Sequence, residues 1–279
     1  MKKLLFVLSL GAVSAFTTNA QVLLSGGLVY GQNFDSLSNA APNATYNWTD
    51  NAMPGMTGWY ASRAFNSGTS SALGPYAYPS VRVGDGAQTS GWLYSFGIAG
   101  TSPLEERSLG SISSGTPKTN VFGLRLQNDT ATALDTVTIS YTGEQWRNGG
   151  NTAVQKLAFS YQVSGSAFTS PIGVGDAGWT SFSSLDFNSP ITGASAAALD
   201  GNAGANRTLF TGIVLTGVTV NPGEEIFLRW LDIDDSGNDH GLAVDDFSVR
   251  FSVAVPEPAV GSLLGLAALG LLMRLRNRR

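Results

Sequence analysis

Apolar and polar side chains alternate along several short stretches from Val121 onwards. In the first of them, Phe122, Leu124 and Leu126 alternate with Arg125 and Gln127. The apolar members of the others are Val137, Ile139 and Tyr141; Leu157, Phe159 and Tyr161; Ile226, Leu228 and Trp230; and Val244, Phe247, Val249 and Phe251. A period of two places every second side chain on one face of a β-strand, so each stretch predicts a strand with a buried face.

Residues that favour turns separate these predicted strands. The clusters at Asn148–Asn151 and Asn221–Gly223 combine Asn, Gly and Pro, each of which suits a tight change of chain direction. No convincing helical periodicity occurs before residue 259, and there is no clear internal repeat. The pattern therefore predicts an antiparallel β-sandwich, which we assign to a single domain over residues 21–254.

The first half of this domain has a less regular pattern. Residues 22–34 are mixed apolar and Gly-rich and predict a first strand that reaches Phe34 and Asp35. Residues 38–120 are rich in Gly, Ser, Pro and Asn, which alone would be compatible with disorder. They also hold many Trp and Tyr residues, which would be costly to leave exposed, so we expect short strands joined by ordered loops.

The composition excludes several kinds of site and partner. The chain has 279 residues, only 13% of which are charged, and it contains no cysteine. Disulfides, thiol nucleophiles and thiolate metal sites are therefore excluded. Residues 21–254 hold ten Lys and Arg against nineteen Asp and Glu, a net charge of −9. That charge repels phosphate backbones, so we expect no nucleic-acid partner; divalent cations or a neutral polysaccharide suit it better.

The two ends of the chain follow a different pattern. Lys2 and Lys3 precede an apolar run to Phe16 and a small-residue exit at Ala20, which predicts a signal peptide over residues 1–20. In the last segment, residues 255–279, an apolar stretch from Ala259 to Met273 follows three residues that predict an extended, accessible chain: Pro256, Glu257 and Pro258.

That apolar stretch predicts a short transmembrane helix. Fifteen residues span about 22 Å as a helix, and flanking side chains can close part of the gap to a bilayer core of about 30 Å. Four arginines end the chain and predict a cytoplasmic C-terminus: Arg274, Arg276, Arg278 and Arg279. With the signal peptide, this places the domain between the two ends on the outer side of the membrane.

The tripeptide, the helix and the arginine cluster together resemble the PEP-CTERM sorting signal of Gram-negative bacteria. The resemblance implies that an exosortase-like membrane enzyme recognises Pro256, Glu257 and Pro258 and cleaves the tail. It also implies an exported protein that is anchored first and then released to the cell surface or the matrix, with extracellular polysaccharide as a partner. The alternative is an ordinary C-terminal anchor.

Six aspartates within Asp232–Asp246 form the densest charged cluster of the domain. Like charges so close together need compensation, and calcium binds carboxylate oxygens. Asp232-x-Asp234-x-Ser236-Gly237 begins like an EF-hand loop, but the twelfth position is Ala243, so that motif is excluded. The alternative is a solvated acidic hairpin that pairs with arginine.

The two ends of the domain share a motif. Phe34-Asp35 near its start and Asp245-Asp246-Phe247 near its end resemble the terminal strands of MAM-like and carbohydrate-binding jelly rolls. The resemblance implies a jelly-roll-like sandwich with its terminal strands side by side. It also implies that Asp35, Asp245 and Asp246 hold a structural calcium.

A last group follows a predicted strand: Glu144, Trp146 and Arg147. A carboxylate, an indole and a guanidinium could form a sugar site, or the segment could be a strand end with Trp146 against the core. His240 is the only histidine and no G-x-S-x-G motif accompanies it, which disfavours a hydrolase triad. We expect a non-catalytic domain that binds polysaccharide or matrix. The alternatives are a glycoside-acting enzyme that uses Glu144 with an aspartate of the 232–246 cluster, and a purely structural module.

Overall fold

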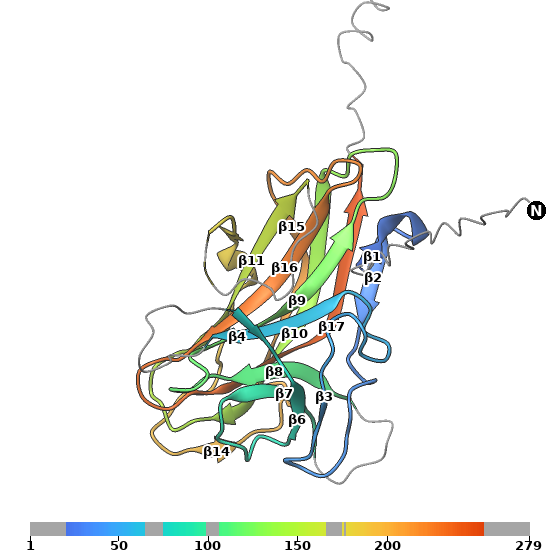
Figure 1. The fold of residues 1–279 in the computed structure, drawn as a ribbon. Helices are drawn as coiled ribbons and strands as arrows, with labels where there is room; N and C mark the ends of the chain where they lie inside the picture. Colours follow the sequence, from blue (N-terminus) through green and yellow to red (C-terminus); the bar gives the residue numbers. More distant parts are fainter. Residues whose placement is uncertain (1–20, 65–74, 99–105, 166–174, 176, 254–279) are drawn as a thin grey trace, which may run out of the picture.

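The computed structural model describes residues 21–64, 75–98, 106–165, 175 and 177–253 (Figure 1). The predicted signal peptide and the predicted sorting tail lie outside these ranges. Within the described residues, no helix is long and apolar enough to cross a membrane. The only helical elements there are two single turns of 3-10 helix, η1 (Leu24–Gly26) and η2 (Ser183–Leu185).

The strands form two sheets. The order in sheet A is β12 (Thr180–Ser181), β11 (Lys156–Ser164), β16 (Glu225–Ile233), β9 (Thr119–Gln127), β4 (Trp59–Ala64) and β5 (Pro75–Ala77), with β1 (Val22–Leu23) beside β9 and β13 (Phe187–Asn188) beside β11. The order in sheet B is β14 (Ala197–Ala198), β10 (Thr136–Asn148), β17 (Gly241–Ser252), β8 (Ser108–Ile112), β7 (Trp92–Phe96), β6 (Ser80–Gly84) and β3 (Thr45–Asn47), with β15 (Arg207–Leu215) beside β10 and β2 (Val29–Gln32) beside β17.

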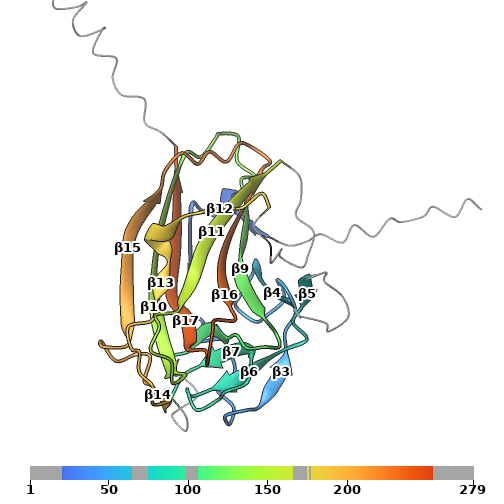
Figure 2. The same ribbon diagram turned by 90° about the vertical axis from the view of Figure 1, so that its left-hand side faces the viewer.

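The chain passes repeatedly from one sheet to the other. From β8 onwards the long strands alternate, with β8, β10, β15 and β17 in sheet B and β9, β11 and β16 in sheet A. Figure 2 shows the two layers, with β15, β10 and β17 in one and β11, β16 and β9 in the other. All pairs of the long strands are antiparallel. The prediction of an all-β, jelly-roll-like sandwich is therefore confirmed.

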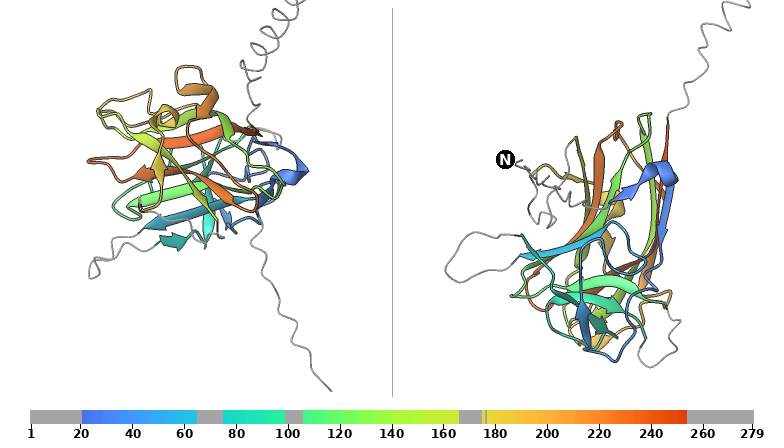
Figure 3. Two further views of the ribbon diagram at one scale, coloured as in Figure 1. Left: turned by 90° about the horizontal axis from the view of Figure 1, so that it is seen from above. Right: turned by 45° about the vertical axis from the view of Figure 1, so that its right-hand side comes forward.

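The first and last strands of sheet B along the chain, β2 and β17, are neighbours. Gln32 of β2 pairs with Phe247 of β17, and Val29 pairs with Arg250 (Figure 3, right). The predicted contact between the Phe34 end and the Phe247 end of the domain is therefore present. Phe34 itself has a φ of 57° and turns its ring inward, where it is buried.

Aromatic rings hold the two sheets together. Trp230 of β16 lies at the centre of the sandwich, stacked on Trp59 at 6.2 Å and packed edge-on against Phe159 at 5.4 Å. From sheet B, Tyr141 and Phe247 meet the same indole at 5.4 and 5.6 Å. These rings carry the apolar positions of the alternating pattern, so the predicted buried faces of the strands are the core.

A second, smaller cluster packs on the other face of sheet B. Its members are Tyr94, Phe96, Ile112, Trp146 and Ala243. On β17, Leu242 and Val244 belong to the main core, so Ala243 between them points to the opposite side of the sheet. The candidate site described below lies next to this second cluster.

Candidate functional site

Three carboxylates converge beside the second cluster. Glu144 comes from β10, Asp245 from β17 and Glu106 from the residues just before β8, and their oxygens lie within 4.8 Å of one another. Thr142 pairs with Asp245, and Glu144 pairs with Ala243, across two neighbouring strands. Glu144 and Asp245 therefore occupy nearby positions on the face of sheet B that points away from the core.

Two of these carboxylates are closed off from solvent. Glu144 and Asp245 are each 1% exposed, whereas Glu106 is exposed. Trp146 donates from Nε1 to Glu144 Oε2 at 3.0 Å and to Ser108 Oγ at 2.8 Å. Asp245 Oδ1 accepts the backbone N–H of Asp246 at 2.7 Å, but its Oδ2 is buried and has no hydrogen-bond partner among the described residues.

Burial has the largest effect on the pKa values of Glu144 and Asp245. It raises the pKa of Glu144 to about 7, and the hydrogen bonds from Trp146 and Ser108 oppose that rise only in part. Burial also raises the pKa of Asp245, and the nearby Glu144 adds to the effect. In the absence of a compensating positive charge, the two carboxyls hold protons at pH values where exposed carboxyls have lost them.

An amide side chain completes the group. Asn202 turns its Oδ1 towards the carboxylates of Glu106 and Glu144. With the amide rotated, its Nδ2 donates to Glu144 Oε1 and to both Glu106 oxygens at 3.2 Å. The segment that carries Asn202 is fixed against sheet B, because the backbone of Gly201 touches the ring of Trp146 so closely that a Cβ would lie 2.4 Å from it.

The predicted calcium ligands do not come together at this point. Only Asp245 belongs to the group of three; Asp246, the next residue on the strand, is exposed and has a φ of 48°. Asp246 lines a separate hollow of about 440 Å³ with Gln32 and Asn33. Asp35 is exposed and accepts the backbone N–H of Arg107 at 3.2 Å. Sequence reasoning missed Glu106 and Asn202, for which no motif gives a signal.

The other aspartates of the 232–246 cluster have separate surroundings. Asp232 is buried and accepts a hydrogen bond from Ser111 Oγ at 2.6 Å. Asp234 forms an ion pair with Lys118 at 3.6 Å. Asp239 Oδ1 accepts the backbone N–H of Asp235 at 2.9 Å. The six carboxylates are therefore distributed along the loop and the strand and do not surround a single point.

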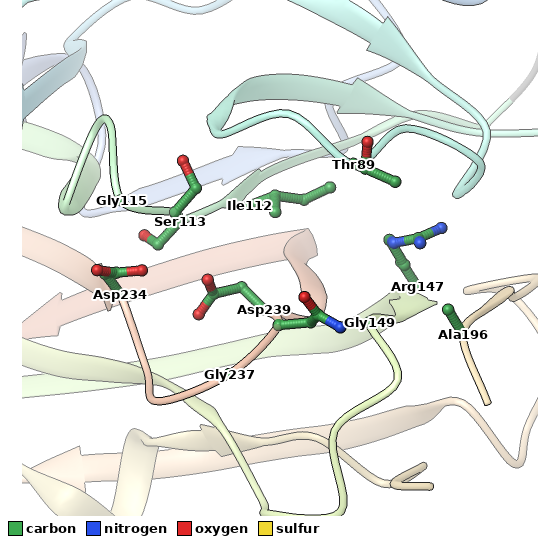
Figure 4. A pocket seen from close by; sticks show the side chains of 12 residues that line it. Thr89, Ile112, Ser113, Gly115, Arg147, Gly149, Ala196, Asp234, Gly237 and Asp239 are labelled. Carbon is green, nitrogen blue, oxygen red and sulfur yellow. The ribbon is translucent and has the colours of Figure 1, made fainter. Parts of the chain in front are cut away.

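A polar cavity opens beside this loop. It has a volume of about 400 Å³. Figure 4 shows Asp234 and Asp239 facing the chain that carries Ile112 and Ser113, with Arg147 at the other end. The complete lining consists of Thr89, Ile112, Ser113, Ser114, Gly115, Arg147, Gly149, Ala196, Asp234, Gly237, Asn238 and Asp239.

Arg147 is held in place at the rim of this cavity. Its guanidinium donates to the carbonyl oxygen of Gly86 at 3.1 Å. Gly86 has a φ of 86°, and a Cβ there would lie 2.0 Å from the carbonyl oxygen of Trp146. Only glycine allows this turn to approach β10 so closely. The turn at Gly86 thus fixes the direction in which Arg147 points.

The three predicted ligand-binding residues are divided between two places. Arg147 lines the cavity, whereas Glu144 belongs to the carboxylate group described above. Trp146 is 1% exposed and its ring stacks on Phe96 at 6.0 Å with an angle of 3° between the planes. Trp146 therefore offers no free ring face to a ligand.

The side chain of His240 lies behind the cavity wall. Its Nδ1 accepts the backbone N–H of Gly149 at 2.9 Å, and its buried Nε2 has no hydrogen-bond partner among the described residues. Burial lowers the pKa of this imidazole, so it is neutral at pH 7. Its contacts support the Gly149 and Asp239 side of the cavity, next to the start of β17.

Comparisons with known proteins give only distant similarities. No protein-family model matches the sequence, and no curated protein matches it either. Among solved structures, the xylan-binding module CBM22-1 of Paenibacillus barcinonensis Xyn10C aligns with 77% of this chain and 99% of its own, at 12% identity and a TM-score of 0.30.

Two further structures show the same level of similarity. TmCBM61, solved with β-1,4-galactotriose, aligns with 53% of this chain and 72% of its own, at 9% identity and a TM-score of 0.25. The arabinose-bound α-L-arabinofuranosidase MgGH51 aligns with 82% of this chain and 32% of its own, at 11% identity and a TM-score of 0.29. Values this low establish neither a common fold nor a common ligand.

Proposed function

We propose that this chain is an exported surface protein whose β-sandwich binds a neutral polysaccharide in the cavity between Arg147 and Asp239. The observation that carries the proposal is the cavity itself. Its volume of about 400 Å³ lies within the usual range of small-molecule sites, and polar groups from several strands and loops converge on it.

The lining suits sugar hydroxyls. A hydroxyl donates one hydrogen bond and accepts others, so a sugar needs both kinds of partner at close range. Arg147 supplies donors, and the exposed hydroxyl of Thr89 both donates and accepts. Burial raises the pKa of Asp239 to about 8, so its carboxyl group holds a proton at neutral pH and can also donate and accept. The net charge of −9 over residues 21–254 disfavours a polyanionic ligand, which makes a neutral glycan the better candidate.

The experiment is a glycan-array screen of the full-length chain, followed by titration calorimetry with the best neutral oligosaccharide. Arg147→Ala removes a donor from the cavity and Asp239→Ala removes its carboxyl group, so each should weaken binding about tenfold, a loss of about 1.4 kcal/mol. Arg250→Ala is the matched control, because it removes an exposed arginine from the far part of β17 and should leave binding unchanged. Equal affinity for all four proteins would exclude this cavity.

A glycoside-acting enzyme is the second candidate. The observation in its favour is that Glu144 and Asp245 have oxygens within 4.8 Å of each other, close to the spacing of paired catalytic carboxylates. Against it, both side chains are 1% exposed, so no substrate reaches them in this conformation. Release of reducing ends from the bound glycan, abolished in Glu144→Gln, would establish hydrolysis and replace the binding proposal.

A further inference from the structure

Among the described residues, no ion pair involves Glu106, Glu144 or Asp245. Arg207, the cross-strand partner of Glu144, lowers the Glu144 pKa, but less than burial raises it and less than the hydrogen bonds from Trp146 and Ser108 lower it. Two carboxylates buried within 4.8 Å of each other repel strongly in the low dielectric of a protein interior. Such an arrangement requires a proton or a cation between them.

Asp245 Oδ2 shows that the contacts of the chain alone do not satisfy the group. This atom is buried on a residue that is 99% inaccessible to solvent, and it has no hydrogen-bond partner among the described residues. Leaving a polar atom in that state costs about 1–3 kcal/mol. Rotation of the Asn202 amide does not remove the cost, because its Nδ2 then reaches Glu106 and Glu144 and not Asp245.

Asn202 lies beside the same carboxylates. Its amide is 3.2 Å from oxygens of Glu106 and Glu144, so it can donate to them through Nδ2 or, turned over, offer its Oδ1 to a cation held between them. Carboxylate and amide oxygens are both ligands for calcium, which binds them at about 2.3–2.6 Å. Two oxygens on opposite sides of one calcium ion are then about 4.6–5.2 Å apart. The spacing of at most 4.8 Å between the three carboxylates fits around a single ion.

We propose that Glu106, Glu144, Asp245 and the Oδ1 of Asn202 form a calcium site on the outer face of sheet B. The ion joins the start of β8, the middle of β10 and β17, and the segment between β14 and β15. The site is distinct from the cavity proposed for polysaccharide, whose lining includes none of these four residues. Asp35 and Asp246 take no part in it.

The test measures thermal unfolding and calcium binding of the full-length chain after removal of metal with a chelator. Millimolar calcium should raise the melting temperature of the wild type, and magnesium at the same concentration should raise it less, because the smaller ion needs shorter and more regular contacts. Calcium should also displace terbium, whose luminescence Trp146 can sensitise because its indole donates directly to Glu144.

Four substitutions change proposed ligands, and a fifth controls for the loss of charge. Glu144→Gln and Asp245→Asn should abolish the calcium shift, and in chelator they should unfold at or above the wild-type temperature, because each removes a buried charge. Asp246→Asn removes the same charge from the next residue and should keep the full shift. Glu106→Gln and Asn202→Ala change more accessible ligands without loss of core packing, and they should weaken calcium binding at least tenfold.

Two results would overturn the calcium site. Absence of any calcium or terbium binding by the wild type would overturn the proposal. Loss of the shift in Asp246→Asn, with the shift retained in Asp245→Asn, would overturn it in favour of a site at the terminal strands. Polysaccharide binding is measured separately, so failure of one proposal leaves the other standing.

Discussion

Asp232 lies at the end of β16 with its carboxyl group fully enclosed. Ser111 Oγ donates to it at 2.6 Å, and Asn120 lies beside it as a second hydrogen-bonding neighbour. Burial nevertheless raises the pKa of Asp232 to about 7, and the charge of Asp235 adds to the rise. The folded state therefore holds a proton on this group that an unfolded chain releases near pH 4.

We predict that Asp232→Asn removes a pH dependence of stability. With a folded-state pKa above the ordinary value of 3.8, the contribution of Asp232 is fully present below about pH 4 and is lost as the pH rises through about 7. Each pKa unit corresponds to about 1.4 kcal/mol. In denaturant titrations with chelator present, the stability of the wild type should fall more than that of Asp232→Asn between pH 4 and pH 8. Parallel curves for the two proteins would contradict this.

At the residue scale, only part of the carboxylate group could be predicted from the sequence. Asp245 could be selected as a ligand because it lies in a dense acidic segment, and it does belong to the carboxylate group. Asp246 was selected with it because it is adjacent, but the pairing of β10 and β17 shifts register here, and Asp246, with a φ of 48°, is exposed and lies outside the carboxylate group. Glu106 and Asn202 reach the group from other segments, and only the folded chain brings them there.

At the scale of elements, β9 and β16 are joined by a buried ion pair. Arg125 of β9 donates to Glu225 of β16 at 2.7 Å, and the two side chains are 0% and 3% exposed. The guanidinium also lies over the rings of Tyr60 and Phe227, at 5.1 Å from each centroid. This polar and aromatic group lies on the face of sheet A opposite to the Trp230 core.

We predict that Arg125→Met destabilises the protein by about 3–5 kcal/mol, because it leaves the Glu225 carboxylate buried without its ionic partner. The double variant Arg125→Met/Glu225→Gln should recover part of that loss, since it no longer buries a charge. Chemical denaturation of the wild type, the two single variants and the double variant measures the coupling. Strictly additive losses would show that the ion pair contributes nothing of its own.

Elements differed in how clearly the sequence predicted them. The strands β9, β10, β11, β16 and β17 place large apolar side chains at every second position, so their alternation was visible in the sequence. By contrast, β15 is an edge strand with most of its residues at least partly exposed, including Leu209 at 66% exposed, so no buried period marks it. The short strands β3, β5, β6 and β7 lie in a Gly-rich segment where turns interrupt any period. The sequence therefore carries no signal for β15, and the short strands between residues 38 and 120 were predicted without their positions.

The whole molecule combines an acidic sandwich with chain ends of different composition. The basic residues outside residues 21–254 are Lys2, Lys3 and the four arginines at the extreme C-terminus. The proposed function assigns export, anchoring and sorting to these two ends. The last strand among the described residues, β17, ends at Ser252, and the Pro-Glu-Pro tripeptide lies outside the described residues.

We predict that the tail is removed in the native host. Mass spectrometry of the surface fraction should find a mature C-terminus between Pro256 and Ala259, because the resemblance to the PEP-CTERM signal implies cleavage there. Replacement of Pro256, Glu257 and Pro258 by alanine should leave the protein in the membrane fraction. Recovery of intact Arg279 from the cell surface would reduce the tail to a permanent anchor.

The direction of β17 sets how far the proposed polysaccharide cavity stands from a membrane. Asp239 and Gly149 line the cavity next to Gly241, where β17 begins, and the strand then runs twelve residues to Ser252 (Figure 1). At about 3.3 Å per residue, the strand carries the chain roughly 40 Å from the cavity before it leaves for the tail. A copy held by its C-terminus would hold the mouth of the cavity above the lipid headgroups, where long polymers from the surroundings can reach it. With the opposite strand direction, the same cavity would face the bilayer.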